Sequence, residues 1–155
     1  MGKKANDVID IKLAVEKKKI RIDGDDNRII ELDTSDLTIL ERLQQVYPRL
    51  NELGIKGFDI DDGSEDSITP ESVAKISDAL SAIDKEMRGI IDFIFDAKIA
   101  DICVPTGALY NMHNGEFQFE RVLDALFGLY ADDIQKEFGK MSDRMKAHTS
   151  KYTGK

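Results

Sequence analysis

The feature that most constrains the fold is a row of seven apolar residues between positions 73 and 94, which recur at alternating steps of three and four. The row comprises Val73, Ile76, Leu80, Ile83, Met87, Ile90 and Ile94. Because an α-helix has about 3.6 residues per turn, this spacing places all of these side chains on one helical face. Thr69 suits the N-cap position and Pro70 the first helical position. The pattern therefore predicts a central helix over residues 70–96, about 40 Å long.

Two interpretations of this apolar face are open, because the spacing suits both the core of an intramolecular bundle and a coiled coil between chains. The opposite face is polar, and we expect water to cover it. It carries Lys75, Asp78, Ser81, Asp84, Lys85, Arg88 and Asp92. Arg88 stands four residues from Asp84 and four from Asp92, so opposite charges can meet on the helix surface.

The N-terminal region has the pattern of a small sheet. Apolar residues alternate with polar ones over 9–15, which is the period of a half-buried strand. The apolar positions then change from odd to even, which predicts a turn or a bulge between Glu16 and Lys19. A turn signal at 24–27 separates the apolar residues of 20–22 from those of 29–32. We therefore expect an antiparallel hairpin or small sheet within residues 8–33.

A helix over residues 35–53 is expected to cover this sheet, since a small sheet is marginally stable alone. Asp33, Thr34 or Ser35 can cap its start. Pro48 is expected to kink or divide it. One side of this helix is apolar and is lined by Leu37, Leu40, Leu43, Tyr47 and Leu50.

Residues 54–68 lack periodicity and are expected to form an exposed acidic loop. The loop invites a calcium hypothesis, but an EF-hand needs glycine at its sixth position and glutamate at its twelfth. Neither register of this loop meets that template, and nor does the run that begins at Asp23, where Arg28 takes the glycine position. We expect no metal site and no cofactor.

Turns and loops are expected over 97–116, because Pro105 and Gly107 mark one turn and Asn114-Gly115 another. Cys103 and His113 are the one thiol and imidazole that this region could bring together, although a lone cysteine between apolar neighbours is usually a core residue. A C-terminal helix over 117–148 and a tail over 149–155 follow. The apolar residues of this helix become sparse after Gln135.

These segments predict a single domain over residues 1–155 of the α+β class, mainly helical. In it, an N-terminal antiparallel hairpin or small sheet packs on a bundle of about three long helices. The formal charge of -8 argues against nucleic-acid binding. No run of about 18 apolar residues is present to span a membrane. A single cysteine and the absence of a secretory signal make the cytoplasm the expected setting.

The basic end of the chain is the candidate binding surface. Phe138, Met141 and Met145 have helical spacing there, and methionine side chains adapt to irregular partners. The alternative is a solvated helix end whose cations complement the helix dipole. Ile90, Phe93 and Ile94 join the candidate set if their end of the central helix is not wholly covered.

Several segments resemble small proteins encoded among the tail genes of phages and prophages of Gram-positive bacteria. The segments are 20–26 (IRIDGDD), 29–36 (IIELDTSD), 46–48 (VYP), 94–96 (IFD), 102–105 (ICVP), 114–117 (NGEF) and 151–155 (KYTGK). Some such proteins are regarded as tail assembly chaperones. These bind the tape-measure protein or tail-tube subunits in the host cytoplasm and leave the finished particle.

The resemblance implies a non-enzymatic protein with tail proteins as partners, and it supplies no catalytic residues. Self-association is a further possibility. A structural tail or connector component that stays in the virion is one alternative, and another protein-binding or regulatory module is a second. An enzyme would need a polar cleft with convergent titratable groups, whereas a binding module needs an apolar patch.

Overall fold

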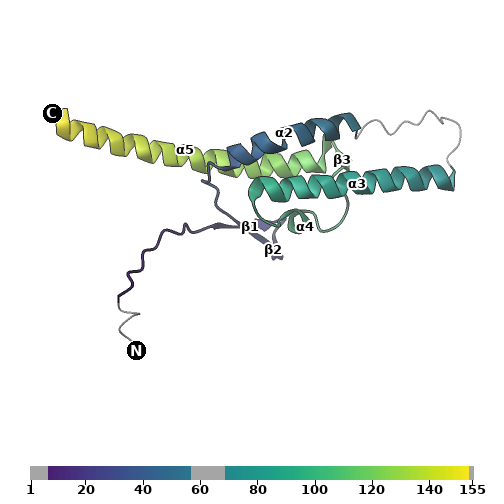
Figure 1. Cartoon of the computed structure of the whole chain (residues 1–155), viewed down its shortest axis with the longest axis horizontal. Coiled ribbons are helices and arrows are strands. Elements are labelled where there is room, and N and C mark those ends of the chain that lie inside the picture. The colour runs from purple at the N-terminus through teal and green to yellow at the C-terminus, as the bar shows by residue number, and fades with distance from the viewer. Residues whose placement is uncertain (1–6, 57–68, 154–155) are drawn as a thin grey trace.

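A computed structural model describes residues 7–56 and 69–153, and in this part of the chain helices dominate over two small antiparallel hairpins (Figure 1). The elements in order are β1 (Lys18–Ile22), β2 (Asp25–Leu32), α2 (Ile39–Lys56), α3 (Pro70–Phe95), α4 (Ala100–Cys103), β3 (Met112–His113), β4 (Glu116–Phe117) and α5 (Gln118–Thr153). The prediction of a mainly helical α+β fold is confirmed. Of the expected acidic loop, residues 54–56 belong to α2 and the remainder lies outside the described residues.

Strands β1 and β2 form the N-terminal hairpin, with Ile20 opposite Ile30 and Lys18 opposite Leu32. The turn lies at Asp23-Gly24, earlier than the predicted 24–27. Both turn residues have positive φ, 53° and 71°, which is the geometry of a two-residue turn that matches the twist of the strands. The irregularity in register falls between Arg21 and Ile22, not between Glu16 and Lys19.

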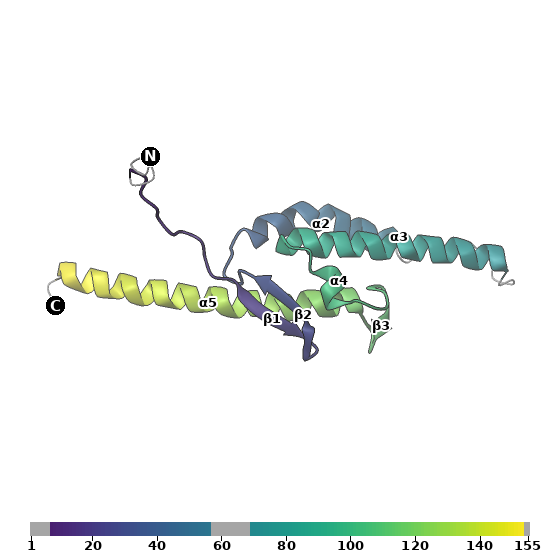
Figure 2. The ribbon, with the colours of Figure 1, turned by 90° about the horizontal axis from the view of Figure 1, so that it is seen from below.

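The predicted strand over residues 9–15 is wrong. Residues 8–17 form no strand and run away from the body as an extended segment with exposed side chains (Figures 1 and 2). Pairing begins at Lys18, opposite Leu32, where β2 ends. Residues before Lys18 therefore have no strand of this hairpin to pair with.

Helix α2 begins at Ile39, later than predicted, because the preceding residues form turns. The carboxylate of Asp36 accepts a hydrogen bond from the backbone N–H of Thr38 at 3.0 Å. Pro48 does not divide the helix, which continues to Lys56. The apolar side of α2 also differs from the prediction. Ile39 and Val46 are buried, whereas Leu40 and Tyr47 on the helix and Leu37 before it are exposed.

Helix α3 confirms the predicted central helix. Thr69 caps it by accepting a hydrogen bond from the N–H of Ser72 at 3.1 Å, and Asp96 ends it in a left-handed conformation. Ile90 and Ile94 are wholly buried, and Met87 is buried beside them. At the other end of the row Val73 and Ile76 are exposed. The second half of the apolar face is thus core of an intramolecular bundle, and the first half extends beyond it.

The polar face of α3 is wrongly predicted to be solvated along its whole length. The carboxylate of Asp92 accepts hydrogen bonds from the backbone N–H groups of Ile99 and Ala100, each at 2.9 Å. Asp84 accepts one from the N–H of Leu109 at 2.8 Å. These carboxylates therefore hold the segment after α3 against the helix by satisfying its backbone donors.

Arg88 completes this attachment. Its guanidinium donates to Asp84 at 2.9 Å, as the spacing predicts, and also to the carbonyls of Val104 at 2.9 Å and Gly107 at 3.1 Å. A four-residue spacing of opposite charges occurs both in solvated ion pairs and in pairs that hold another segment, as Arg88 and Asp84 do. The sequence alone could not tell which kind this pair is. Arg88 fixes the turn at Pro105 and Gly107 in place.

Two other arginines bind carbonyls at helix C-termini, where the dipole favours cations. Arg42 on α2 donates to the carbonyl of Ile94 at 2.6 Å. Arg28 on β2 donates to that of Cys103 on α4 at 2.6 Å. The hairpin, α2, α3 and α4 are thereby joined through side chains that cross between elements.

The second predicted turn is also present, since Asn114 and Gly115 have φ of 55° and 81° and join β3 to β4. Helix α5 follows and runs to Thr153, beyond the predicted end at 148. In its first half Phe127 and Tyr130 pack on Phe95 of α3, with ring centroids 5.5 and 5.6 Å away. The second half extends past the body of the protein (Figures 1 and 2).

We expect Asp92→Ala to lower the free energy of unfolding by about 1–3 kcal/mol, because it leaves two backbone donors without an acceptor. Asp78→Ala, on the exposed part of the same helix, is the matched control and should change stability by less than about 0.5 kcal/mol. Urea titration measures both. Equal effects of the two substitutions would show that the Asp92 hydrogen bonds do not hold the segment.

Candidate functional site

Three of the predicted binding residues lie together on the projecting half of α5. Phe138, Met141 and Met145 are 49%, 42% and 58% exposed. Their steps of three and four place them on one face of the helix. We call these three residues the α5 surface. Half-exposed aromatic and methionine side chains in a row form an apolar patch of the kind that binds other proteins.

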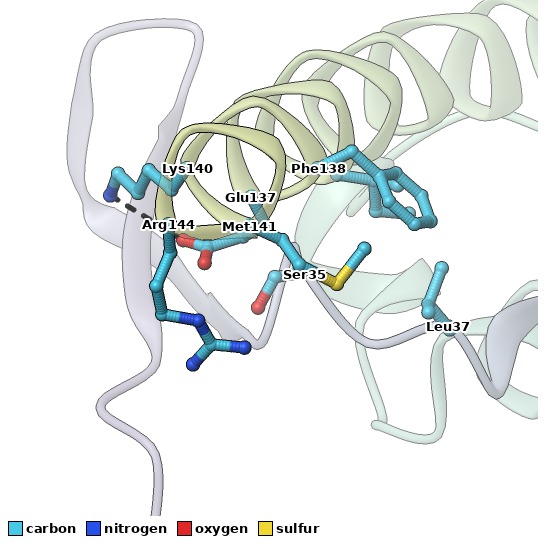
Figure 3. A pocket seen from close by; sticks show the side chains of 8 residues that line it. Ser35, Leu37, Glu137, Phe138, Lys140, Met141 and Arg144 are labelled. Carbon is cyan, nitrogen blue, oxygen red and sulfur yellow. Dashed lines mark ion pairs between the residues drawn. The ribbon is translucent and has the colours of Figure 1, made fainter. Parts of the chain in front are cut away.

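The α5 surface borders an open hollow of about 360 Å³ between α5 and the residues that precede α2. Figure 3 shows Met141 reaching from α5 toward Leu37, with Phe138 on the same side of the helix. The hollow is lined by Ser35, Leu37, Ile134, Glu137, Phe138, Lys140, Met141 and Arg144. It therefore has an apolar centre and charged side chains around it.

The charge around this hollow is opposite in sign to that of the whole chain. Residues 136–149 contain four basic and two acidic side chains, whereas the chain carries a net charge of -8. Lys140 lies 3.6 Å from Glu137, an exposed pair of small energetic value (Figure 3). Lys140 and Arg144 thus offer positive charge beside the apolar side chains.

Asp133 fixes α5 at the point where the projecting half begins. Its carboxylate lies 2.6 Å from the ammonium of Lys18 on β1 and accepts the hydroxyl of the buried Thr34. The hydrogen bonds from Lys18 and Thr34 hold the pKa of Asp133 below its ordinary value. This contact ties α5 to the hairpin and to the turn that leads into α2.

The other predicted binding residues are not part of this site. Ile90 and Ile94 are wholly buried, so they cannot contact a partner in the folded protein. The condition attached to them, that this end of α3 is not wholly covered, holds for Phe93 only, because Ile90 and Ile94 belong to the hydrophobic core. Phe93 is partly exposed but lies on α3 and does not line the hollow.

Leu37 lines the hollow, although the sequence pattern predicts it on the buried side of a helix. Its spacing from Leu40 assigned it to the buried side of a helix beginning at 35. The helix begins instead at Ile39, so Leu37 lies in the preceding turn and faces the hollow. A signal for the later start was available in Asp36, which is followed two residues later by Thr38 in the pattern of an Asx turn.

The Cys103 thiol lacks the properties of a nucleophile, which argues against a reactive pair with His113. Cys103 is buried, and burial raises its pKa to about 11. A thiol with this pKa is almost wholly protonated at neutral pH and is a poor nucleophile. His113 lies on the exposed strand β3. Cys103 belongs to the hydrophobic core.

Metal binding, membrane spanning and similarity to known proteins were each searched for. No group of three or more His, Cys, Asp or Glu side chains among them is placed to hold a metal ion. None of the helices in residues 7–56 and 69–153 has the length and apolar character needed to cross a membrane. Comparison of the sequence and the fold with family models, curated proteins and solved structures gives no significant match.

Asp133→Asn tests the tie between α5 and the hairpin. Because the pKa of Asp133 is lowered on folding, its ionised form stabilises the folded protein above the ordinary aspartate pKa of about 3.9. This stabilisation is lost as the pH falls through the lowered folded pKa. We expect the variant to be less stable than the wild type at pH 7, and the difference to shrink below about pH 4.

Urea titrations at a series of pH values measure this difference. Asp132→Asn, which changes the exposed neighbouring carboxylate, is the matched control. A difference between Asp133→Asn and the wild type that stays constant down to the onset of acid unfolding would contradict the assigned role.

Proposed function

We propose that this protein is a non-enzymatic tail assembly chaperone of a phage or prophage. In this proposal it binds the tape-measure protein or a tail-tube subunit in the cytoplasm of the host bacterium and is released from the finished tail. The observation that carries the proposal is the α5 surface, an apolar row on a helix half that projects from the body. The resemblance of several sequence segments to tail-gene proteins supplies the class of partner.

The size of the α5 surface fits a reversible complex. Burying a large apolar side chain contributes about 1.5–3 kcal/mol, and half of each of the three side chains is already buried. Covering them contributes on the order of 2–4 kcal/mol, which alone corresponds to a dissociation constant of roughly 1–30 mM. Contacts with the hollow and with its charges must supply the remaining affinity. A complex built this way can dissociate when the tail is complete.

The chemistry of the site favours an acidic amphipathic helix as the segment that binds. Apolar side chains at steps of three and four on such a helix can pack on Phe138 and Met141 and enter the hollow. Carboxylates beside them can pair with Lys140 and Arg144 at its edge. Methionine side chains adjust to different apolar partners, which suits a protein that must bind an unassembled chain.

We expect Met141→Lys to weaken binding of the tape-measure or tube protein at least about tenfold, because it places a charge in the apolar centre of the site. The protein and each candidate are co-expressed, and the affinity is measured with the purified pair. Val73→Lys is the matched control, since Val73 is 49% exposed and lies on the distant end of α3. Equal loss of binding in both variants, or in neither, would contradict the assignment of the site.

A second variant lacks residues 137–155. It tests separately whether this segment is needed for partner binding and whether it is needed for folding. The core residues of α5 end at Tyr130, and Ile134 packs against them. We therefore expect the truncated chain to keep a cooperative unfolding transition while losing the partner. Retained affinity would overturn the proposed surface, and global unfolding would show that the segment is needed for the fold.

A further inference from the structure

The extended segment before β1 carries an apolar row that the described residues of the chain leave exposed. Ile9, Ile11, Leu13 and Val15 alternate with polar or small residues, and their exposed fractions run from 63% for Val15 to 88% for Ile9. We call residues 8–15 the arm. It leaves the body at the same end as the projecting half of α5 (Figures 1 and 2).

Alternation with a period of two is typical of a strand in a sheet that has one face covered and the other exposed. The arm has this pattern, but the hairpin of its own chain offers it no strand, since β2 ends opposite Lys18. A strand from another molecule can satisfy its backbone groups and cover its apolar side chains.

The arm is complementary to a second copy of itself in antiparallel orientation. When the pairing is centred on Ile11, this residue lies opposite Ile11 of the second copy. Ile9 then lies opposite Leu13, and Asp10 lies opposite Lys12. Residues directly opposite each other in an antiparallel pair point to the same face. The side chains of Ile9, Ile11 and Leu13 therefore meet on one face, and Asp10 and Lys12 meet twice on the other.

Neighbouring registers lack this pairing of opposite charges. A pairing centred on Lys12 sets the two lysines against each other and leaves Asp10 opposite Ala14. A pairing centred on Asp10 sets two aspartates together and places Val8 opposite Lys12. Like charges directly opposite each other destabilise a strand pair. Charge thus selects the register centred on Ile11. The apolar pattern alone does not, since the register centred on Lys12 sets Ile9 opposite Val15 and Ile11 opposite Leu13.

We infer that two copies of this protein associate through their arms, which form a two-stranded antiparallel ribbon with a two-fold axis at Ile11. The contact is the same surface on both chains and closes with two copies. The run Lys17-Lys18-Lys19 follows the arm and opposes further strand addition along β1. This inference goes beyond the proposed chaperone function and does not depend on it.

The apolar face of the ribbon needs a cover, since two strands alone are marginally stable. Val15, at the base of the arm, already lines a hollow with Lys136 and Lys140 of α5. The arm is roughly 26 Å long when extended, and the projecting part of α5 from Gln135 to Thr153 is roughly 28 Å long. Helix and ribbon are therefore comparable in length and adjoin at their bases.

Disulfide cross-linking of full-length variants tests both the association and the register. Under mild oxidation we expect Ile11→Cys to form a covalent dimer, because residues directly opposite in an antiparallel pair lie within disulfide range. Ile9→Cys and Leu13→Cys should cross-link poorly alone and efficiently when mixed in equal amounts. The buried native Cys103 serves as the background, and Val73→Cys serves as an exposed control.

Charge reversal provides a second measurement. Asp10→Lys should weaken the dimer at least about tenfold, measured by light scattering over a concentration series, because it places like charges opposite each other. Adding Lys12→Asp to the same chain should restore association. A wild-type protein that stays monomeric at its highest soluble concentration would overturn the inference. Equal cross-linking of all single-cysteine variants would overturn the register, as would failure of the double variant to recover.

Discussion

Burial of Ile90, Ile91 and Ile94 is central to this fold, because these α3 side chains lie in one hydrophobic core with residues of the other long elements. All three side chains are fully excluded from solvent. β2, α2, α4 and α5 supply the side chains around them, and the attachment is completed by polar contacts that cross between elements. The core is short compared with the helices. Both α3 and α5 therefore continue past it, and apolar residues on those extensions remain exposed.

The projecting parts of the chain are where the proposed binding functions reside. The core fixes the start of α5, and Asp133 ties that helix to the hairpin just before the α5 surface begins. A partner therefore meets a helix whose base is rigidly held and whose apolar row is already formed. The arm leaves the body nearby and has the pattern of a strand. The two surfaces differ in chemistry, since one suits an acidic helix and the other suits a matching strand.

The sequence predicts well those features that depend on local periodicity and capping. The central helix from Pro70 and the two turns with positive φ near Gly24 and Gly115 belong to this group. It fails where the outcome depends on what a segment meets in space. The arm has the alternation of a strand but no neighbouring strand among residues 7–56 and 69–153. Asp92 looks like a surface acid but accepts two backbone hydrogen bonds. Ile90 and Phe138 belong to equally regular rows, and only the tertiary fold decides that the first is buried and the second exposed.

The most direct test of the central claim is the amount of this protein in purified virions relative to the infected-cell lysate. Quantitative mass spectrometry measures this ratio against a tail-tube subunit as the internal standard. A tail assembly chaperone is expected to be abundant in the lysate, where it is captured together with the tape-measure or tube protein, and to be depleted from virions. A fixed stoichiometric amount in virions would contradict the chaperone proposal and make the protein a structural component of the tail.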